Sequence, residues 1–73
     1  MDFTEKIDQA FSYMSDGAIY RVIMDDMEKL LIEKALEKTN GNQIWAARLL
    51  GLNRNTLRSK IKKFNISLEK YRQ

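Results

Sequence analysis

The chain has 73 residues, enough for one small domain, and it contains neither cysteine nor histidine. This excludes a disulfide framework and a thiolate zinc site and removes the usual general base. No apolar run approaches the ~20 residues of a membrane span, and the N-terminus lacks a signal-peptide pattern. Residues 1–40 carry five cations and nine acids (net −4), and residues 41–73 carry eight cations and one acid (net +7). Only the second half would attract a polyanion, so we expect the two halves to have different roles.

The composition predicts an all-α fold of four helices, because there is no proline and leucine, isoleucine, lysine and glutamate are frequent. The first helix is expected over residues 3–14, where apolar residues recur at helical spacing along one face. Asp2 or Thr4 is a suitable cap for its start. The run Ser15-Asp16-Gly17 should end it, with Ser15 or Asp16 capping the next helix.

The second helix is expected over residues 18–39, with Gly41 well placed to terminate it. Its apolar residues cover more than the arc of about 100° that packing on one side requires. The surplus predicts a second buried face, and dimerisation is a common remedy for a small core. We therefore expect the N-terminal helix pairs of two copies to form a four-helix bundle. The expected interface residues are Phe3, Ile7, Phe11, Ile19, Ile23, Met24, Met27, Leu30 and Leu31. The alternative is a monomer in which the first helix covers that second face.

Residues 43–50 and 54–64 are predicted to form two short helices joined by a tight turn. Gly51 can adopt a positive φ at little steric cost, and Asn42 and Asn53 are suitable N-caps. Ala47 provides the small side chain that two steeply crossing helices need where they meet.

The last predicted helix has one apolar face and one cationic face. Leu57, Ile61 and Phe64 share the apolar face. The opposite face carries Asn55, Arg58, Ser59 and Lys62. A short helix, a glycine turn and a basic second helix together predict a helix-turn-helix. The alternative is an ordinary helical hairpin with a solvated cationic face.

Asn65 is expected to end this helix, and Ile66 to fold back onto the core. The polar segment after it is expected to fray. The predicted organisation is one compact domain, with dimerisation helices over residues 1–40, the helix-turn-helix over 41–66 and a flexible tail over 67–73.

The pattern N-G-N-Q-x-x-A-A-R-L-L-G-L-N-R-N-T-L-R-x-K-I-K-K-F-x-I, from Asn40 to Ile66, resembles the Fis-type helix-turn-helix. Two groups share this domain, namely Fis itself and the C-terminal domain of NtrC-like enhancer-binding activators. The run R-L-L-G-L-N-R-N-T-L is more similar to the activators. The sequence departs from Fis at Ile44, Trp45 and Ser59, and no strand-like segment precedes the first helix.

The resemblance implies a homodimer that places its last helix in the major groove of double-stranded DNA. It also implies an ATPase domain upstream in a full-length activator. By motif position, Asn53, Arg54, Thr56 and Arg58 would contact DNA, and Asn42 and Gln43 would position the backbone. The full set of expected DNA contacts is Asn42, Gln43, Asn53, Arg54, Asn55, Thr56, Arg58, Ser59, Lys60, Lys62 and Lys63.

Individual roles follow from side-chain chemistry. Arg54 and Arg58 are the best candidates for reading bases, because a guanidinium fork matches the O6 and N7 acceptors of guanine. The alternative is that both contact phosphate alone. The lysines at positions 60, 62 and 63 are expected to neutralise phosphates. Trp45 is expected either to pack against the second helix or an upstream element, or to lie beside the sugar-phosphate backbone.

The leading functional hypothesis is a sequence-specific, dimeric DNA-binding domain of a cytoplasmic, nucleoid-associated transcription activator. The alternatives are a stand-alone Fis-like protein that bends DNA and a dimerisation or docking module that does not bind DNA. An enzyme is not expected, since the sequence offers no catalytic constellation. We expect no cofactor, metal, membrane or small-molecule substrate.

Overall fold

A computed structural model describes residues 2–72 and confirms the all-α fold, with no strand among these residues. The helices are α1 (Phe3–Tyr13), α2 (Ile19–Lys38), α3 (Gln43–Leu50) and α4 (Arg54–Lys63), followed by a 3-10 turn at Glu69–Tyr71. Each predicted helix is present, with ends within one residue of the expected bounds. No helix in the described part of the chain has the length and apolarity that crossing a bilayer would require.

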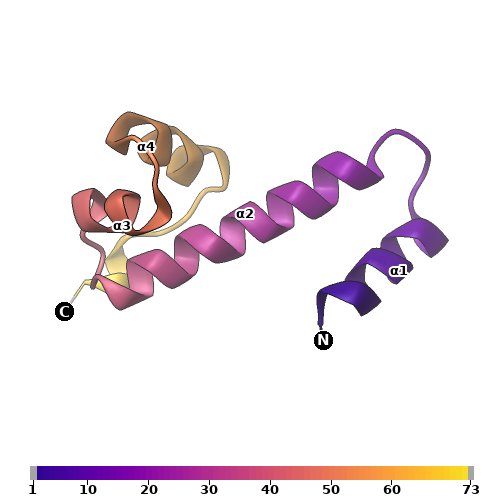
Figure 1. Cartoon of the computed structure of the whole chain (residues 1–73), viewed down its shortest axis with the longest axis horizontal. Coiled ribbons are helices and arrows are strands. Elements are labelled where there is room, and N and C mark those ends of the chain that lie inside the picture. Colours follow the sequence, from indigo (N-terminus) through magenta and orange to yellow (C-terminus); the bar gives the residue numbers. More distant parts are fainter. Residues whose placement is uncertain (1, 73) are drawn as a thin grey trace.

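The molecule measures 40 × 23 × 20 Å, and the long helix α2 connects its two ends (Figure 1). Helix α1 folds back beside the N-terminal half of α2. Helices α3 and α4 and the C-terminal segment gather around its other half (Figure 1). The N-terminal pair and the helix-turn-helix therefore lie at opposite ends of one long helix.

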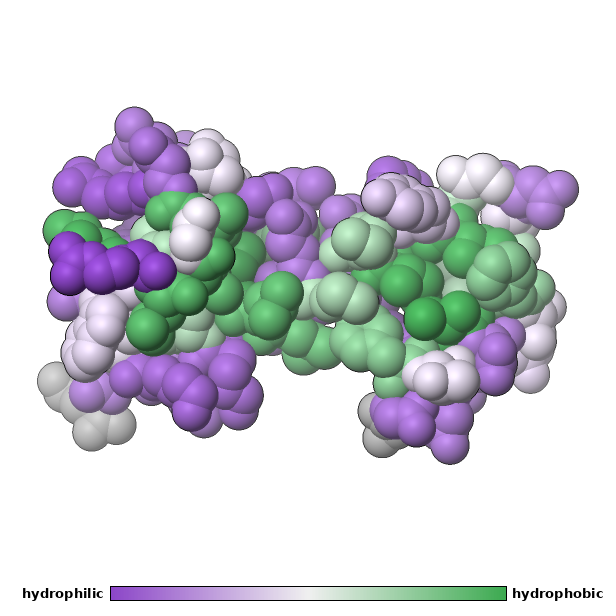
Figure 2. All heavy atoms as spheres, in the orientation of Figure 1, coloured by the Kyte–Doolittle hydropathy of each residue, from purple (hydrophilic) through white to green (hydrophobic). Residues whose placement is uncertain are grey.

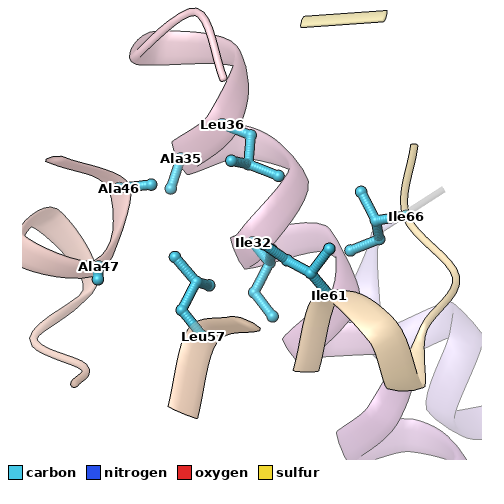
Figure 3. Packing of buried hydrophobic residues seen from close by; sticks show 8 residues of the cluster. All are labelled: Ile32, Ala35, Leu36, Ala46, Ala47, Leu57, Ile61 and Ile66. Atoms are coloured by element: carbon cyan, nitrogen blue, oxygen red, sulfur yellow. The ribbon is translucent and has the colours of Figure 1, made fainter. Parts of the chain in front are cut away.

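The hydrophobic core lies between the C-terminal half of α2 and the helix-turn-helix. Side chains from three helices and the segment after α4 meet there (Figure 3). The buried set is Ile32, Ala35, Leu36, Ala46, Ala47, Leu57, Ile61 and Ile66. Ile66 thus folds back onto the core, as the sequence predicts. This core holds α4 against α2.

The other end of the molecule is much less buried. Among the described residues of α1 and the first half of α2, only Ala10 and Ile23 are buried. Figure 2 shows apolar surface on this end of the molecule. An apolar hollow of about 420 Å³ lies between the two helices, lined partly by Ile7, Phe11 and Met24.

Local capping explains most helix ends. Asp2 caps α1 by accepting a hydrogen bond from the Glu5 amide at 3.0 Å. Helix α2 differs from expectation, because its N-cap is Ala18 and no side chain accepts from its first turn. Its C-terminus is closed by Thr39, a buried residue whose hydroxyl donates to the Ala35 carbonyl at 3.0 Å.

The segment after α4 is more ordered than its polar composition suggests. We expected fraying from residue 67, whereas Leu68, just before the 3-10 turn, and Tyr71, its last residue, pack against the core. The two apolar residues are three apart, and one 3-10 turn brings that spacing onto one side. The polar composition of the segment does not reveal that these two residues share a side. Gln73 lies outside the described residues.

Candidate nucleic-acid interface

The turn between α3 and α4 has the geometry that the sequence predicts. Gly51 is left-handed at φ +73°, and the Leu52 amide donates to the Ala47 carbonyl at 2.9 Å. Asn53 then caps α4 by accepting from the Asn55 amide at 2.7 Å. Ala46 and Ala47 are buried, which allows the neighbouring helices to approach closely. A reversal this short sets α4 at an angle to α3 and exposes its far side.

Asn42 organises the start of α3 in the same way. Its side chain accepts from the Trp45 amide at 3.0 Å, so it is an N-cap, as predicted. Gln43 is the first residue of α3 and is half-buried. The free amides of this first turn carry the positive end of the helix dipole.

One side of α4 is cationic in sequence but paired in the structure. The Lys60 ammonium lies 2.6 Å from the Glu28 carboxylate, and Lys63 lies 3.2 Å from Asp25, both acids of α2. Helical spacing places Thr56 on this same side. Lys60 and Lys63 thus have acidic partners on α2, and their expected contact with phosphates stays a prediction. Counting charges along α4 could not reveal acids that lie more than thirty residues away.

A second side of α4 faces the start of α3 across a polar hollow of about 400 Å³. Arg54 and Arg58 line it from α4, and Arg72 lines it from the C-terminal segment. The remaining lining residues are Gly41, Asn42, Gln43 and Ile44. Arg72 is not among the DNA contacts predicted from the sequence, because it stands in a segment expected to fray. The apolar spacing of Leu68 and Tyr71 was the available signal.

The third side of α4 points into solvent. Asn55, Arg58, Ser59 and Lys62 line a shallow depression there, and all four are exposed. These are the residues that helical periodicity placed opposite the apolar face. Arg58 borders both this depression and the polar hollow, so the two surfaces are continuous.

The ion pairs divide the cations into two groups. Each of the five ion pairs found in residues 2–72 uses a lysine, and none uses an arginine. Arg54, Arg58 and Arg72, together with Lys62, therefore make no ion pair within the described part of the chain. Among residues 41–72, every cation without an ion pair in the described part of the chain except Arg48 lines the polar hollow or the outer side of α4.

Trp45 is 52% exposed on the outer side of α3, where Ile44 and Leu49 are each 55% exposed. Its packing against an upstream element or beside the sugar-phosphate backbone stays a prediction. The acids of α2 also have a simple structural role, since Asp25, Glu28 and Glu33 each lie within 4.0 Å of a lysine.

Two short helices that meet at a left-handed glycine, with an exposed cationic side on the second, define a helix-turn-helix domain. The profile of a family described as "Bacterial regulatory protein, Fis family" matches residues 23–64, which is more than half of the chain. The chain therefore belongs to the Fis family of bacterial regulatory proteins, which confirms the family predicted from the sequence.

Curated relatives fall into two groups. The chain is 47% identical over 55 residues to "DNA-binding transcriptional regulator NtrC" of Azospirillum brasilense, covering 75% of this chain and 11% of that protein. It is 46% identical over 68 residues to the NtrC of Rhizobium meliloti (strain 1021), covering 88% and 14%. It is 37% identical over 49 residues to "DNA-binding protein Fis" of Proteus mirabilis (strain HI4320), covering 67% and 50%. The chain thus spans half or less of these relatives. No solved structure matches it.

Proposed function

We propose that the chain is a sequence-specific domain that binds double-stranded DNA with α4 in the major groove. The observation that carries this proposal is the sorting of cations on α4. Lys60 and Lys63 pair with α2, whereas Arg54, Arg58 and Lys62 are exposed and form no ion pair in residues 2–72. A surface that keeps two arginines and one lysine unpaired is suited to an external anion.

The proposed contacts follow the sides of α4. The major groove is about 12 Å wide and accepts one α-helix. Arg54 and Arg58 would contact base edges, because the start of a recognition helix enters the groove first. The remaining proposed contacts, to phosphate or base edges, are Asn42, Gln43, Asn53, Asn55, Ser59 and Lys62. Thr56, Lys60 and Lys63 stay in the proposed set as phosphate contacts, with Lys60 and Lys63 also paired to acids of α2.

The relatives favour an activator over a stand-alone nucleoid protein. The matches to NtrC extend over 75% and 88% of the chain at 47% and 46% identity, against 67% at 37% for Fis. We therefore propose that the chain is the DNA-binding domain of an NtrC-like activator that acts at enhancer sites. An upstream ATPase domain, a two-component signal and a cytoplasmic, nucleoid-associated location belong to the same proposal.

A salt titration with selected duplexes tests DNA binding directly. A random duplex library would first be selected for bound sites, and affinity for selected and random duplexes would then be measured as salt is raised. Each neutralised phosphate contributes about 0.9 to the slope of log K against log salt. We expect a steep negative slope on both duplexes and tighter binding to the selected one. A slope near zero would exclude phosphate-dominated binding.

We also propose that two copies associate through α1 and the N-terminal half of α2. Five of the nine expected interface residues line the apolar hollow, namely Ile7, Phe11, Ile19, Ile23 and Met24. Ile23 is already buried within the chain, whereas Leu30 and Leu31 remain exposed farther along α2. A second copy is the occupant that suits this surface, because closed two-fold pairing buries the same apolar patch on both subunits.

Replacing Phe11 with glutamate should dissociate this dimer. Phe11 is 69% exposed and lines the hollow. Losing the burial of one phenylalanine per copy costs about 1.5–3 kcal/mol, so the dimer dissociation constant should rise by about 10²- to 10⁴-fold. The matched control is Tyr13→Glu, at an aromatic residue of α1 that is 87% exposed and outside the hollow lining. Equal dimer strength for both variants in sedimentation equilibrium would contradict the proposed interface.

The exposed apolar surface of α1 and α2 also favours a second candidate, a docking module that does not bind DNA. Sedimentation with and without the selected duplex separates the two functions. A dimer that ignores every duplex would support docking alone, whereas a complex of two chains per duplex would support dimeric DNA recognition.

A further inference from the structure

Arg72 lies far from the arginines of α4 in sequence but beside them in space. It lines the same polar hollow as Arg54 and Arg58, opposite the first turn of α3. Three guanidinium groups from two separate segments thus surround one open depression of about 400 Å³. Like charges gather only at an energetic cost, and a bound anion would offset that cost.

The position of Arg72 is set by the packing of the segment that carries it. Leu68 and Tyr71 pack against the core, and Lys70 lies 4.0 Å from Glu33 of α2. The Arg72 amide donates to the Glu69 carbonyl at 3.3 Å. Apolar packing and a backbone hydrogen bond therefore bring Arg72 to the rim of the hollow.

Gly41 allows this segment to approach closely. A Cβ added at Gly41 would lie 3.4 Å from the Arg72 Cγ and 3.5 Å from the Tyr71 Cβ. Gly41 is also left-handed at φ +82°, a conformation that L side chains rarely adopt. The connection between α2 and α3 therefore has its smallest residue where the C-terminal segment rests against it.

We propose that Arg72 is a phosphate-binding residue, which holds a backbone phosphate of the DNA beside the base-reading arginines of α4. This inference rests on the proposed function. The first helix of a helix-turn-helix crosses the sugar-phosphate backbone while the second enters the groove. The hollow lies between these two helices, where a phosphate would meet Arg72 together with the free amides of α3. Arg72 lies outside the segment that matches the family profile, residues 23–64.

A phosphate contact predicts a loss that does not depend on base sequence. Arg72→Gln should weaken binding to selected and random duplexes by the same factor. With one arginine lost from each of two copies, the negative slope of log K against log salt should become shallower by about 1.8. The affinity gap between wild type and variant should therefore narrow by about 12-fold as salt rises from about 50 to about 200 mM.

The control is Lys70→Gln, which removes the same charge from the same turn but at a residue directed toward Glu33. It should keep the wild-type slope, and Arg72→Lys should recover most of the slope lost in Arg72→Gln. Circular dichroism would show that every variant retains its helical content. Equal slopes for Arg72→Gln and Lys70→Gln would overturn the inference, because the loss would then follow net charge.

Three further outcomes separate this inference from its alternatives. If the wild type binds duplex through Arg54 and Arg58 but Arg72→Gln has the wild-type slope, the inference fails and the proposed function stands. If the wild type binds no duplex, both fail. In the last experiment, inorganic phosphate is titrated into the protein, and its binding is followed through the amide resonances of Gln43 and Ile44. Saturation by phosphate together with an unchanged DNA slope in Arg72→Gln would identify a free-anion site and overturn the proposed DNA contact.

Discussion

Replacing Arg54 or Arg58 with alanine is expected to abolish most of the discrimination between selected and random duplexes. A guanidinium that donates two hydrogen bonds to guanine contributes about 1–3 kcal/mol of discrimination, which corresponds to about 5- to 150-fold per contact. With two copies bound to one site, the free energy of discrimination would be doubled. Binding to random duplexes should fall much less, because only a charge is lost there. Fluorescence anisotropy on both duplexes measures the ratio.

Arg21→Ala is the matched control. It removes the same side chain and the same charge from an exposed position in α2, far along the chain from the helix-turn-helix. This variant should keep the wild-type ratio of affinities. If Arg54→Ala and Arg58→Ala weaken selected and random duplexes equally, both arginines contact phosphate alone, and base reading must come from the outer side of α4.

Replacing Leu57 with alanine is expected to cause a large loss of stability. Leu57 is 0% exposed and joins α4 to the core formed by α2 and α3 (Figure 3). Truncating a buried leucine costs about 2–5 kcal/mol, because transfer free energy is lost and a cavity remains. A domain of this size has a total stability of roughly 4–11 kcal/mol, so this one change would remove a large part of it. Urea denaturation followed by circular dichroism measures the difference.

Leu49→Ala makes the same chemical change at a residue of α3 that is 55% exposed. It should cost less than about 1 kcal/mol, since little burial is lost and alanine favours helix. Both variants must be compared at one protein concentration, because stability depends on concentration if the chain dimerises. An equal or larger loss for Leu49→Ala would show that the exposed side of α3 is covered in solution.

The features predicted well from the sequence are those set by neighbouring residues. Asn42 and Asn53 cap the helices that follow them, and each accepts from an amide two or three residues along the chain. Gly51 and Asn65 adopt positive φ where two helices were expected to end. Such conformations depend on a few adjacent residues, so the pattern of caps and breakers was sufficient to place them.

The features that were missed depend on contacts between distant parts of the chain. Nothing near Lys60 or Lys63 in the sequence announces Asp25 and Glu28, which become neighbours only when α4 packs on α2. Arg72 reaches the hollow only because its segment folds back onto the core. Helical periodicity identified a cationic face on α4, but the division of its cations between α2 and solvent is a property of the packed structure.

The 20 residues of α2 form one uninterrupted rod about 30 Å long, without proline or glycine along its length. Each end of this rod carries a different surface, so the offset between the apolar hollow and the arginines is rigid. Two copies joined at the apolar ends would consequently hold their two α4 helices at one fixed distance from each other. Operators would then be selected by the helical phase between their two halves as well as by base sequence, because α2 has no glycine or proline at which it would bend to absorb an added half-turn of DNA.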